Sequence, residues 1–250
     1  MSGRSPSDEV KLKQHRCEGR GINYIPWILV SEKSLYSTTY TPKNWKIGRD
    51  MQLLSTGEMK SFFHTNWFDD VHEIREQYVL DYDLTCEIAD DLGYRPPSNR
   101  MSTDLLITVG GSIQEDVAIS IKGSRYALKL ENRKKYISEM QRQRIEEEYW
   151  DRKGIPYIVK YESDYNRIRC NNIRNCAHFY DSREIQSDSH AISYLIIHKI
   201  IHVDLNKERL NYAALLKEYE KEVQNLYDKL REIQRPYWLE HYTRPVFRIG

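Results

Sequence analysis

Two short apolar runs in the first half of the chain, each bordered by polar residues, have the composition of β-strands. Residues 105–109 and 117–121 are rich in Leu, Ile and Val, and a Gly-Gly-Ser segment at 110–112 lies between them. A glycine-containing turn between two strand-like runs is typical of a β-hairpin. We therefore expect an antiparallel pair of strands that brings Asp104, before the first run, close to Lys122, after the second.

The second of these strands carries polar side chains on one of its faces. Side chains alternate between the two faces of a strand, so Ser120 and Lys122 share one face while Ile119 and Ile121 share the other, which we expect to pack into the core. Hydrolysis of a phosphodiester uses a hard divalent cation that polarises the phosphate and lowers the pKa of the attacking water. Asp104 would be a ligand of that cation, together with the main-chain carbonyl of Ile121, and Lys122 would orient the water and offset charge on the phosphate.

A further acid lies upstream, where residues 53–63 have the pattern of the start of an amphipathic helix. Ser55 and Glu58 have the spacing of a capping box, which would give Glu58 a structural role in the first turn. The alternative is that Glu58 is an acid of a nuclease site. Spacing alone favours the capping role, because an Asp, an upstream Glu and a later polar residue two before a Lys are easily found by chance.

The pattern becomes helical after the hairpin and then returns to a strand. Residues 128–153 form a charged helical stretch that ends at Gly154, and residues 155–161 have the composition of a buried strand. A strand, a helix and a further strand in this order suit an α/β nuclease core.

From about residue 165 onward the pattern is mainly helical. We expect helices at 191–203, 207–219 and 221–234, followed by short strand-like runs at 237–242 and 246–249, the order found in a winged helix. This region would bind DNA through its third helix or dock a protein, since that helix carries acids and bases in similar numbers. His198 and His202 are spaced to share one helix face, and we interpret them as core or boundary residues in preference to metal ligands.

Composition restricts the class of protein without deciding it. The chain has 250 residues, of which 40% are hydrophobic, enough for one full core and a small second domain. The net charge is only +1, so DNA binding would depend on local basic patches. The four cysteines lack the spacing of a disulfide framework, and no apolar run is long enough to span a bilayer or resembles a signal peptide. We expect a cytoplasmic protein with no membrane partner.

Two groups of basic residues are candidates for contact with phosphate groups. One follows the second strand of the hairpin and the other lies near the N-terminus, in a polar stretch that we expect to be flexible. Their members are Arg125, Lys129, Arg133, Lys134 and Lys135 in the first group, and Lys11, Lys13, Arg16 and Arg20 in the second.

Several segments in order along the chain resemble the TnsA family, the endonuclease subunits of heteromeric cut-and-paste transposases. The resemblance covers most of the first 170 residues. It is carried by Tyr24-Ile-Pro-Trp27, Leu53-Leu-Ser55, Val71-His-Glu-Ile-Arg-Glu-Gln77, Met101-Ser-Thr-Asp104, Ala118-Ile-Ser-Ile-Lys122, Glu148-Tyr-Trp150 and Ile155-Pro-Tyr157. It implies a bacterial protein and an α/β fold of the restriction-endonuclease-like PD-(D/E)xK superfamily at residues 19–164, between a flexible polar arm (1–18) and a mainly helical, winged-helix-like domain (165–250).

The resemblance also assigns roles to individual residues. The active-site acid of the first helix falls on Glu58, the metal-binding aspartate on Asp104 and the lysine on Lys122. Ser120 stands where the family has a glutamine and most related nucleases have an acid. Because a serine is a shorter and weaker ligand, the number of metal ions is in question. Gln77 and its neighbour Glu76 would lie in a strand that lines the site, either supporting its ligands or packing in the core.

The function that the resemblance implies is hydrolysis of the 5′ DNA strands at transposon ends, with Mg²⁺ as cofactor and Mn²⁺ as its substitute. The implied partners are double-stranded DNA, a TnsB-type transposase that cuts the 3′ strands, and a TnsC-type AAA+ ATPase. Two alternatives remain at this point. One is a catalytically degenerate subunit that bridges the transposase and the ATPase, with Ser120 as the mark of its degeneracy. The other is a free-standing restriction or junction-resolving nuclease.

Overall fold

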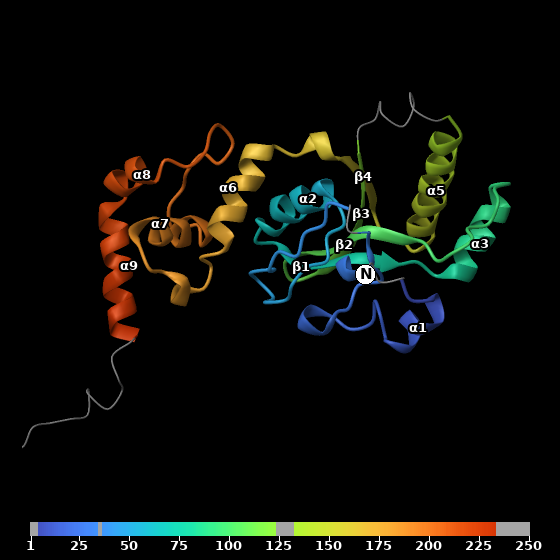
Figure 1. Cartoon of the computed structure of the whole chain (residues 1–250), viewed down its shortest axis with the longest axis horizontal. Helices are drawn as coiled ribbons and strands as arrows, with labels where there is room; N and C mark the ends of the chain where they lie inside the picture. The colour runs from blue at the N-terminus through green and yellow to red at the C-terminus, as the bar shows by residue number, and fades with distance from the viewer. Residues whose placement is uncertain (1–4, 35–36, 124–132, 234–250) are drawn as a thin grey trace, which may run out of the picture. The chain divides into compact units, whose positions relative to one another are not determined.

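The computed structural model describes residues 5–34, 37–123 and 133–233, which form two compact units, Met1–Asn171 and Asn172–Gly250 (Figure 1). The first unit is a mixed α/β structure built around one four-stranded sheet. The described part of the second unit is helical.

The sheet of the first unit has the strand order β1-β2-β3-β4. Its strands are β1 (Val71–Val79), β2 (Ser102–Gly110), β3 (Gln114–Lys122) and β4 (Tyr157–Tyr161). β2 pairs antiparallel with β1 and β3, whereas β3 and β4 are parallel. A parallel pair needs a crossover connection, and helix α5 (Arg133–Arg152) lies within it.

The hairpin expected from the sequence is confirmed. Leu105 lies opposite Ile119 across the antiparallel pair, and the strands meet at Gly110, whose φ of +120° is open to glycine and strained for other residues. β4 begins later than expected and is half-buried, with Ile158 40% exposed, because it lies at the edge of the sheet and has a strand neighbour on one side only. α5 is followed by Gly154 with a φ of +66°, as predicted.

Helices cover both faces of the sheet. Leu106 and Ala118 pack in one apolar cluster with Ile145, Tyr149 and Trp150 of α5, and helix α3 contributes to the same cluster. On the opposite face, the side chain of Ile121 lies against the N-terminal turn of α2 (Thr56–Asn66). The other elements of this unit are α1 (Asp8–Lys13), η1 (Gly21–Asn23), η2 (Val30–Glu32), α3 (Tyr82–Asp91) and η3 (Glu162–Asp164).

Residues 5–18, the described part of the arm expected at residues 1–18, contain a short helix and two buried basic side chains. Residues 8–13 form α1, and the guanidinium group of Arg16 is buried, where it donates to the main-chain oxygen of Trp27 and pairs with Glu32 at 2.5 Å. Lys11 is also buried, with its ammonium group 5.0 Å from the centre of the Trp27 ring. Single hydrogen bonds, ion pairs and cation–π contacts of this kind leave no periodic pattern in the sequence.

Two of the helices expected in the second unit are shorter than predicted, whereas the helix expected at residues 221–234 has the predicted length. α6 (Arg167–Ala177) spans the boundary between the units and is followed by η4 (Ser182–Glu184), α7 (Asp188–Ile197), α8 (Tyr212–Glu218) and α9 (Glu220–Ile233). α7 ends well before residue 203, because Lys199 adopts a left-handed φ of +56°. The strand-like runs at 237–242 and 246–249 lie outside the described residues. Within the described part of the chain, no helix is both long and apolar enough to cross a membrane.

Candidate active site

Glu58 lies in the first turn of α2, where its side chain is almost fully buried at 6% exposure. Ser55 caps the helix by accepting the N–H of Glu58 at 3.1 Å, as predicted, and its hydroxyl donates to the Glu58 carboxylate at 3.0 Å. The N–H of Leu54 and the side-chain amide of Gln77 also donate to that carboxylate, at 2.9 and 3.1 Å. The capping motif therefore fixes Glu58 without excluding a role in a site.

Gln77 reaches Glu58 from an irregular point of β1. Its φ is +50°, which is uncommon for a residue other than glycine, and the β1–β2 register runs on either side of it without a pair at Gln77 and Asp104. The carbonyl oxygen of Gln77 leaves the ladder and accepts the N–H of Trp27 at 3.2 Å. The strained backbone at Gln77 therefore belongs to a residue whose side chain points toward Glu58.

Asp104 is partly exposed and lies where the pairing of β2 with β3 ends. Its Oδ2 accepts the main-chain N–H of Ile121 at 2.6 Å, so the carboxylate is fixed to the end of β3. Burial raises the pKa of Asp104, while the positive charge of Lys122, the Ile121 N–H and the Ser120 hydroxyl lower it. The hairpin thus brings Asp104 and Lys122 together, as the sequence predicts.

Ser120 is 1% exposed, and its hydroxyl donates to Glu146 of α5 at 3.3 Å. Glu146 is itself 4% exposed and accepts the hydroxyl of Thr103 at 2.7 Å, while Thr103 accepts the indole N–H of Trp150 at 2.8 Å. The hydroxyl of Tyr157 is buried nearby without a partner in hydrogen-bonding geometry. The face of β3 that carries Ser120 is therefore covered by α5.

The charge of Asp104 affects the pKa of both other carboxyl groups. Burial, and next the charge of Asp104, raises the pKa of Glu58 to about 8 and that of Glu146 to about 7, from an ordinary value of 4.5. Lys122 acts in the opposite direction on Glu146, because its positive charge favours the ionised carboxylate. Asp104 is thus flanked by an acid from α2 and an acid from α5, with one lysine near them.

Asp104 and Glu58 carry oxygen atoms of the kind that bind hard divalent cations. Mg²⁺ prefers carboxylate oxygens, usually takes one or two of them from the protein, and keeps several waters. Asp104 and Glu58 provide such a pair, and a divalent cation would offset the negative charge of Asp104, which contributes to the raised pKa of Glu58. Among the residues that the structure describes, no three His, Cys, Asp or Glu side chains are arranged to hold a metal ion. A magnesium ion at this place would therefore be held by two carboxylates and by water molecules.

The basic residues singled out in the sequence fall into different environments. Arg125 and Lys129 lie outside the described residues, whereas Arg133, Lys134 and Lys135 are exposed at the start of α5. Near the N-terminus, Lys11 and Arg16 are buried, and Arg20 pairs with Glu73 at 3.2 Å.

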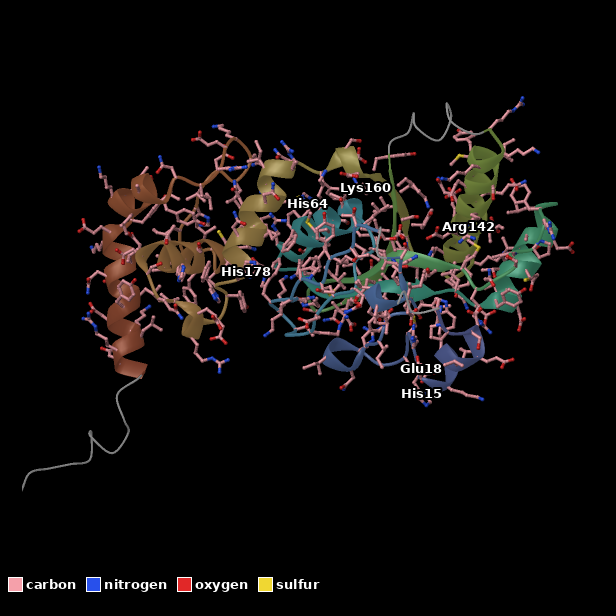
Figure 2. All side chains as sticks on the ribbon, viewed as in Figure 1. His15, Glu18, His64, Arg142, Lys160 and His178 are labelled. Atoms are coloured by element: carbon pink, nitrogen blue, oxygen red, sulfur yellow. The ribbon has the colours of Figure 1, made fainter. Side chains whose placement is uncertain are left out.

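Among the described residues, no histidine or cysteine forms a hydrogen bond with the carboxyl group of Glu58, Asp104 or Glu146. Figure 2 shows His64 of α2 near Lys160 of β4, and burial, followed by the charges of Arg169 and Lys160, lowers the pKa of His64. His198 and His202 do not share a helix face, since α7 ends at Ile197, and His198 donates to the Tyr180 carbonyl at 2.8 Å. All four cysteines are free thiols.

Glu146 is the residue of this cluster that the sequence reasoning missed. A signal is present, because Tyr149 and Trp150 follow it at three and four positions, so Glu146 shares a helix face with two large aromatic residues. An acid on the apolar face of a helix is unusual and indicates a buried charge with a specific role.

Comparison with known proteins agrees with this geometry. Residues 68–162 match the family described as TnsA-like endonuclease N terminal. The chain is also 32% identical over 168 residues to the Transposon Tn7 transposition protein TnsA of Escherichia coli. That similarity covers 65% of this chain and 59% of the relative, so the chain matches well under two thirds of the length of that protein. The segment that carries Asp104, Ser120, Lys122 and Glu146 therefore lies within the part of the chain that is similar to the TnsA-like endonuclease N-terminal family.

Proposed function

We propose that this protein is the endonuclease subunit of a cut-and-paste transposition complex and hydrolyses the 5′ DNA strand at each transposon end. The observation that carries the proposal is the convergence of Glu58, Asp104 and Lys122 from α2, β2 and β3, two of them within the TnsA-like segment. The restriction-endonuclease-like character of the fold is part of the proposal and is supported by a sheet with helices on both faces.

The residues of the chain would divide the chemistry among them. Asp104 and Glu58 would hold Mg²⁺, or Mn²⁺ in its place, together with the main-chain carbonyl of Ile121. The bound cation would polarise the phosphate and make its water a better nucleophile. Lys122 would offset the negative charge that develops on the phosphate, and it would help to orient the attacking water. Gln77 and Ser55 would keep the Glu58 carboxylate in place through the hydrogen bonds described above.

The partners belong to the same proposal. Double-stranded transposon ends would be the substrate, a TnsB-type transposase would cut the 3′ strands, and a TnsC-type AAA+ ATPase would complete the complex. Exposed Arg133 and Lys134 at the start of α5 would contact phosphate groups of the DNA.

Strand-resolved cleavage tests the proposal directly. End-labelled transposon-end DNA is incubated with the partner transposase and either the wild-type chain or Asp104→Ala, in Mg²⁺ and in Mn²⁺. We expect the 5′ cut only with the wild-type chain, because Asp104 would be the main ligand, and an unchanged 3′ cut in both reactions. Asp151→Ala is the matched control, since this aspartate is exposed on α5, and it should cleave like the wild type.

Three other outcomes would contradict the proposal. Loss of both cuts in a fully assembled complex would show that Asp104 does not act on the 5′ strand alone. A wild-type complex that cuts only the 3′ strand would favour the bridging subunit. Cleavage of DNA by the purified chain without any partner would favour a free-standing nuclease.

A further inference from the structure

Glu146 is a buried carboxylate that the proposed chemistry does not use. Among the described residues, the hydroxyl groups of Thr103 and Ser120 donate to it, and the charge of Lys122 and the nearby Tyr157 hydroxyl also favour its ionised form. A buried charge is nevertheless costly, because a carboxylate loses strong hydration on burial. A glutamine has a single acceptor oxygen, so it could accept the Thr103 proton but would turn an N–H toward Ser120. Only a carboxylate lets both hydroxyl groups act as donors to this side chain.

The two oxygens of Glu146 have different partners. Oε1 accepts from Thr103, which is held in turn by the indole N–H of Trp150, so this oxygen is anchored to the apolar cluster of α5. Oε2 is left for the hydroxyl of Ser120. The carboxylate is therefore fixed by one oxygen and presents the other to β3.

Ser120 stands next to the point where Asp104 is held. The residue after it, Ile121, donates its N–H to Asp104, and Leu105, the residue after Asp104, pairs with Ile119. A hydroxyl group has one proton and two lone pairs. The Ser120 hydroxyl lies within reach of both Glu146, to which it donates at 3.3 Å, and Asp104, whose pKa it lowers. When Glu146 takes the proton, the lone pairs of Oγ are left for a cation beside Asp104, and the hydrogen bond to a carboxylate makes that oxygen a stronger ligand.

We propose that Glu146 is a positioning residue that makes Ser120 a competent ligand for the divalent cation of this site. Glu146 accepts the Ser120 proton, and the pair together replaces the longer amide or acid side chain found at this position in related nucleases. This inference rests on the proposed function, because it requires that a divalent cation binds beside Asp104. Ligand orientation by a hydrogen-bonded carboxylate of this kind changes metal affinity by about 10–100-fold in other sites.

Mn²⁺ binding to the full-length chain without DNA tests the pair. Isothermal titration measures the Mn²⁺ affinity, and circular dichroism measures the melting temperature with and without Mn²⁺. We expect Glu146→Gln and Ser120→Ala each to weaken Mn²⁺ binding by about tenfold, and the double variant to be no weaker than either single one, because both changes break the same unit. Without Mn²⁺, Glu146→Gln should melt at the wild-type temperature or above it.

Glu147→Gln is the matched control, because Glu147 is the exposed neighbour on α5 and pairs with Arg144. It should bind Mn²⁺ like the wild type. Wild-type affinity in Glu146→Gln, additive losses in the double variant, or a lowered melting temperature without Mn²⁺ would overturn the inference and leave Glu146 as a structural residue. A wild-type chain that binds no Mn²⁺ would overturn both this inference and the metal dependence of the proposed function.

Discussion

Arg49 and Glu76 form a buried ion pair behind the candidate site. Both terminal nitrogens of Arg49 lie 2.7 Å from the two carboxylate oxygens of Glu76, and the two side chains are 9% and 0% exposed. The N–H of Gln52 also donates to Glu76, at 2.8 Å. Because Gln77 follows directly along β1, this pair supports the residue that holds Glu58.

Removing one partner of this pair should destabilise the protein strongly. Arg49→Met leaves the Glu76 carboxylate buried without a cation, and we expect a loss of about 3–5 kcal/mol in the free energy of unfolding, measured by urea denaturation. The double variant Arg49→Met with Glu76→Gln removes the uncompensated charge and should recover more than half of that loss. A single variant within 1 kcal/mol of the wild type, or a double variant without recovery, would contradict this account.

At the residue scale, the sequence predicts those parts of the site that follow from local spacing. Asp104 and Lys122 border a hairpin, and Glu58 lies in a capping motif, so all three can be placed from neighbouring residues. Glu146 and Gln77 could not be assigned in this way. The role of Glu146 depends on how α5 packs on the sheet, and the role of Gln77 depends on a left-handed backbone that its side chain does not favour.

At the element scale, the β2–β3 hairpin decides whether Asp104 meets Ile121 and Lys122. Its turn requires glycine at position 110, because a Cβ atom there would lie 2.3 Å from the main-chain oxygen of Ile113. The next residue, Gly111, has open space around it and no positive φ. The structure therefore requires a glycine at position 110 but not at position 111.

Alanine substitutions at these two glycines should have clearly different effects on the free energy of unfolding. Gly110→Ala forces both a strained φ and a main-chain clash, and we expect it to lower the free energy of unfolding by about 2–4 kcal/mol. Gly111→Ala should stay within about 0.5 kcal/mol of the wild type. Thermal and urea denaturation of both variants measure the difference, and equal stabilities would show that the turn has another conformation.

The elements themselves were predictable to different degrees. The hairpin and α5 have strong local patterns, and both are confirmed. The end of α7 and the exposure of β4 depend on the left-handed Lys199 and on the place of β4 at the sheet edge, which are properties of the folded chain. α3 and α6 were missed because their apolar positions are few and interrupted by polar residues.

At the scale of the whole molecule, the carboxyl cluster links stability to pH. Glu58 and Glu146 have pKa values of about 8 and about 7 in the folded protein, against an ordinary value of 4.5. Between pH 5 and 8 the folded state therefore keeps protons that the unfolded state has released. Stability falls with rising pH wherever the folded state binds more protons.

Without divalent cations, we expect the free energy of unfolding to decrease from pH 5 to pH 8. Urea denaturation in the presence of EDTA at several pH values measures this slope. Glu146→Gln removes one of the two groups and should flatten the slope mainly below pH 7, whereas Glu147→Gln should leave it unchanged. Stability that increases over this interval would mean that the two carboxyl groups are already ionised in the folded protein.

The parallel pairing of β3 with β4 has a consequence for the order of events in folding. The turn of the β2–β3 hairpin is only a few residues long, whereas residues 123–156 separate β3 from β4. Closing the longer segment loses more chain entropy, so the hairpin can form early and the crossover late. Asp104 and Lys122 would then meet first, and Glu146 would arrive with α5. The repulsion between these acidic side chains would therefore arise late in folding. A nascent chain on the ribosome would contain only part of the cluster.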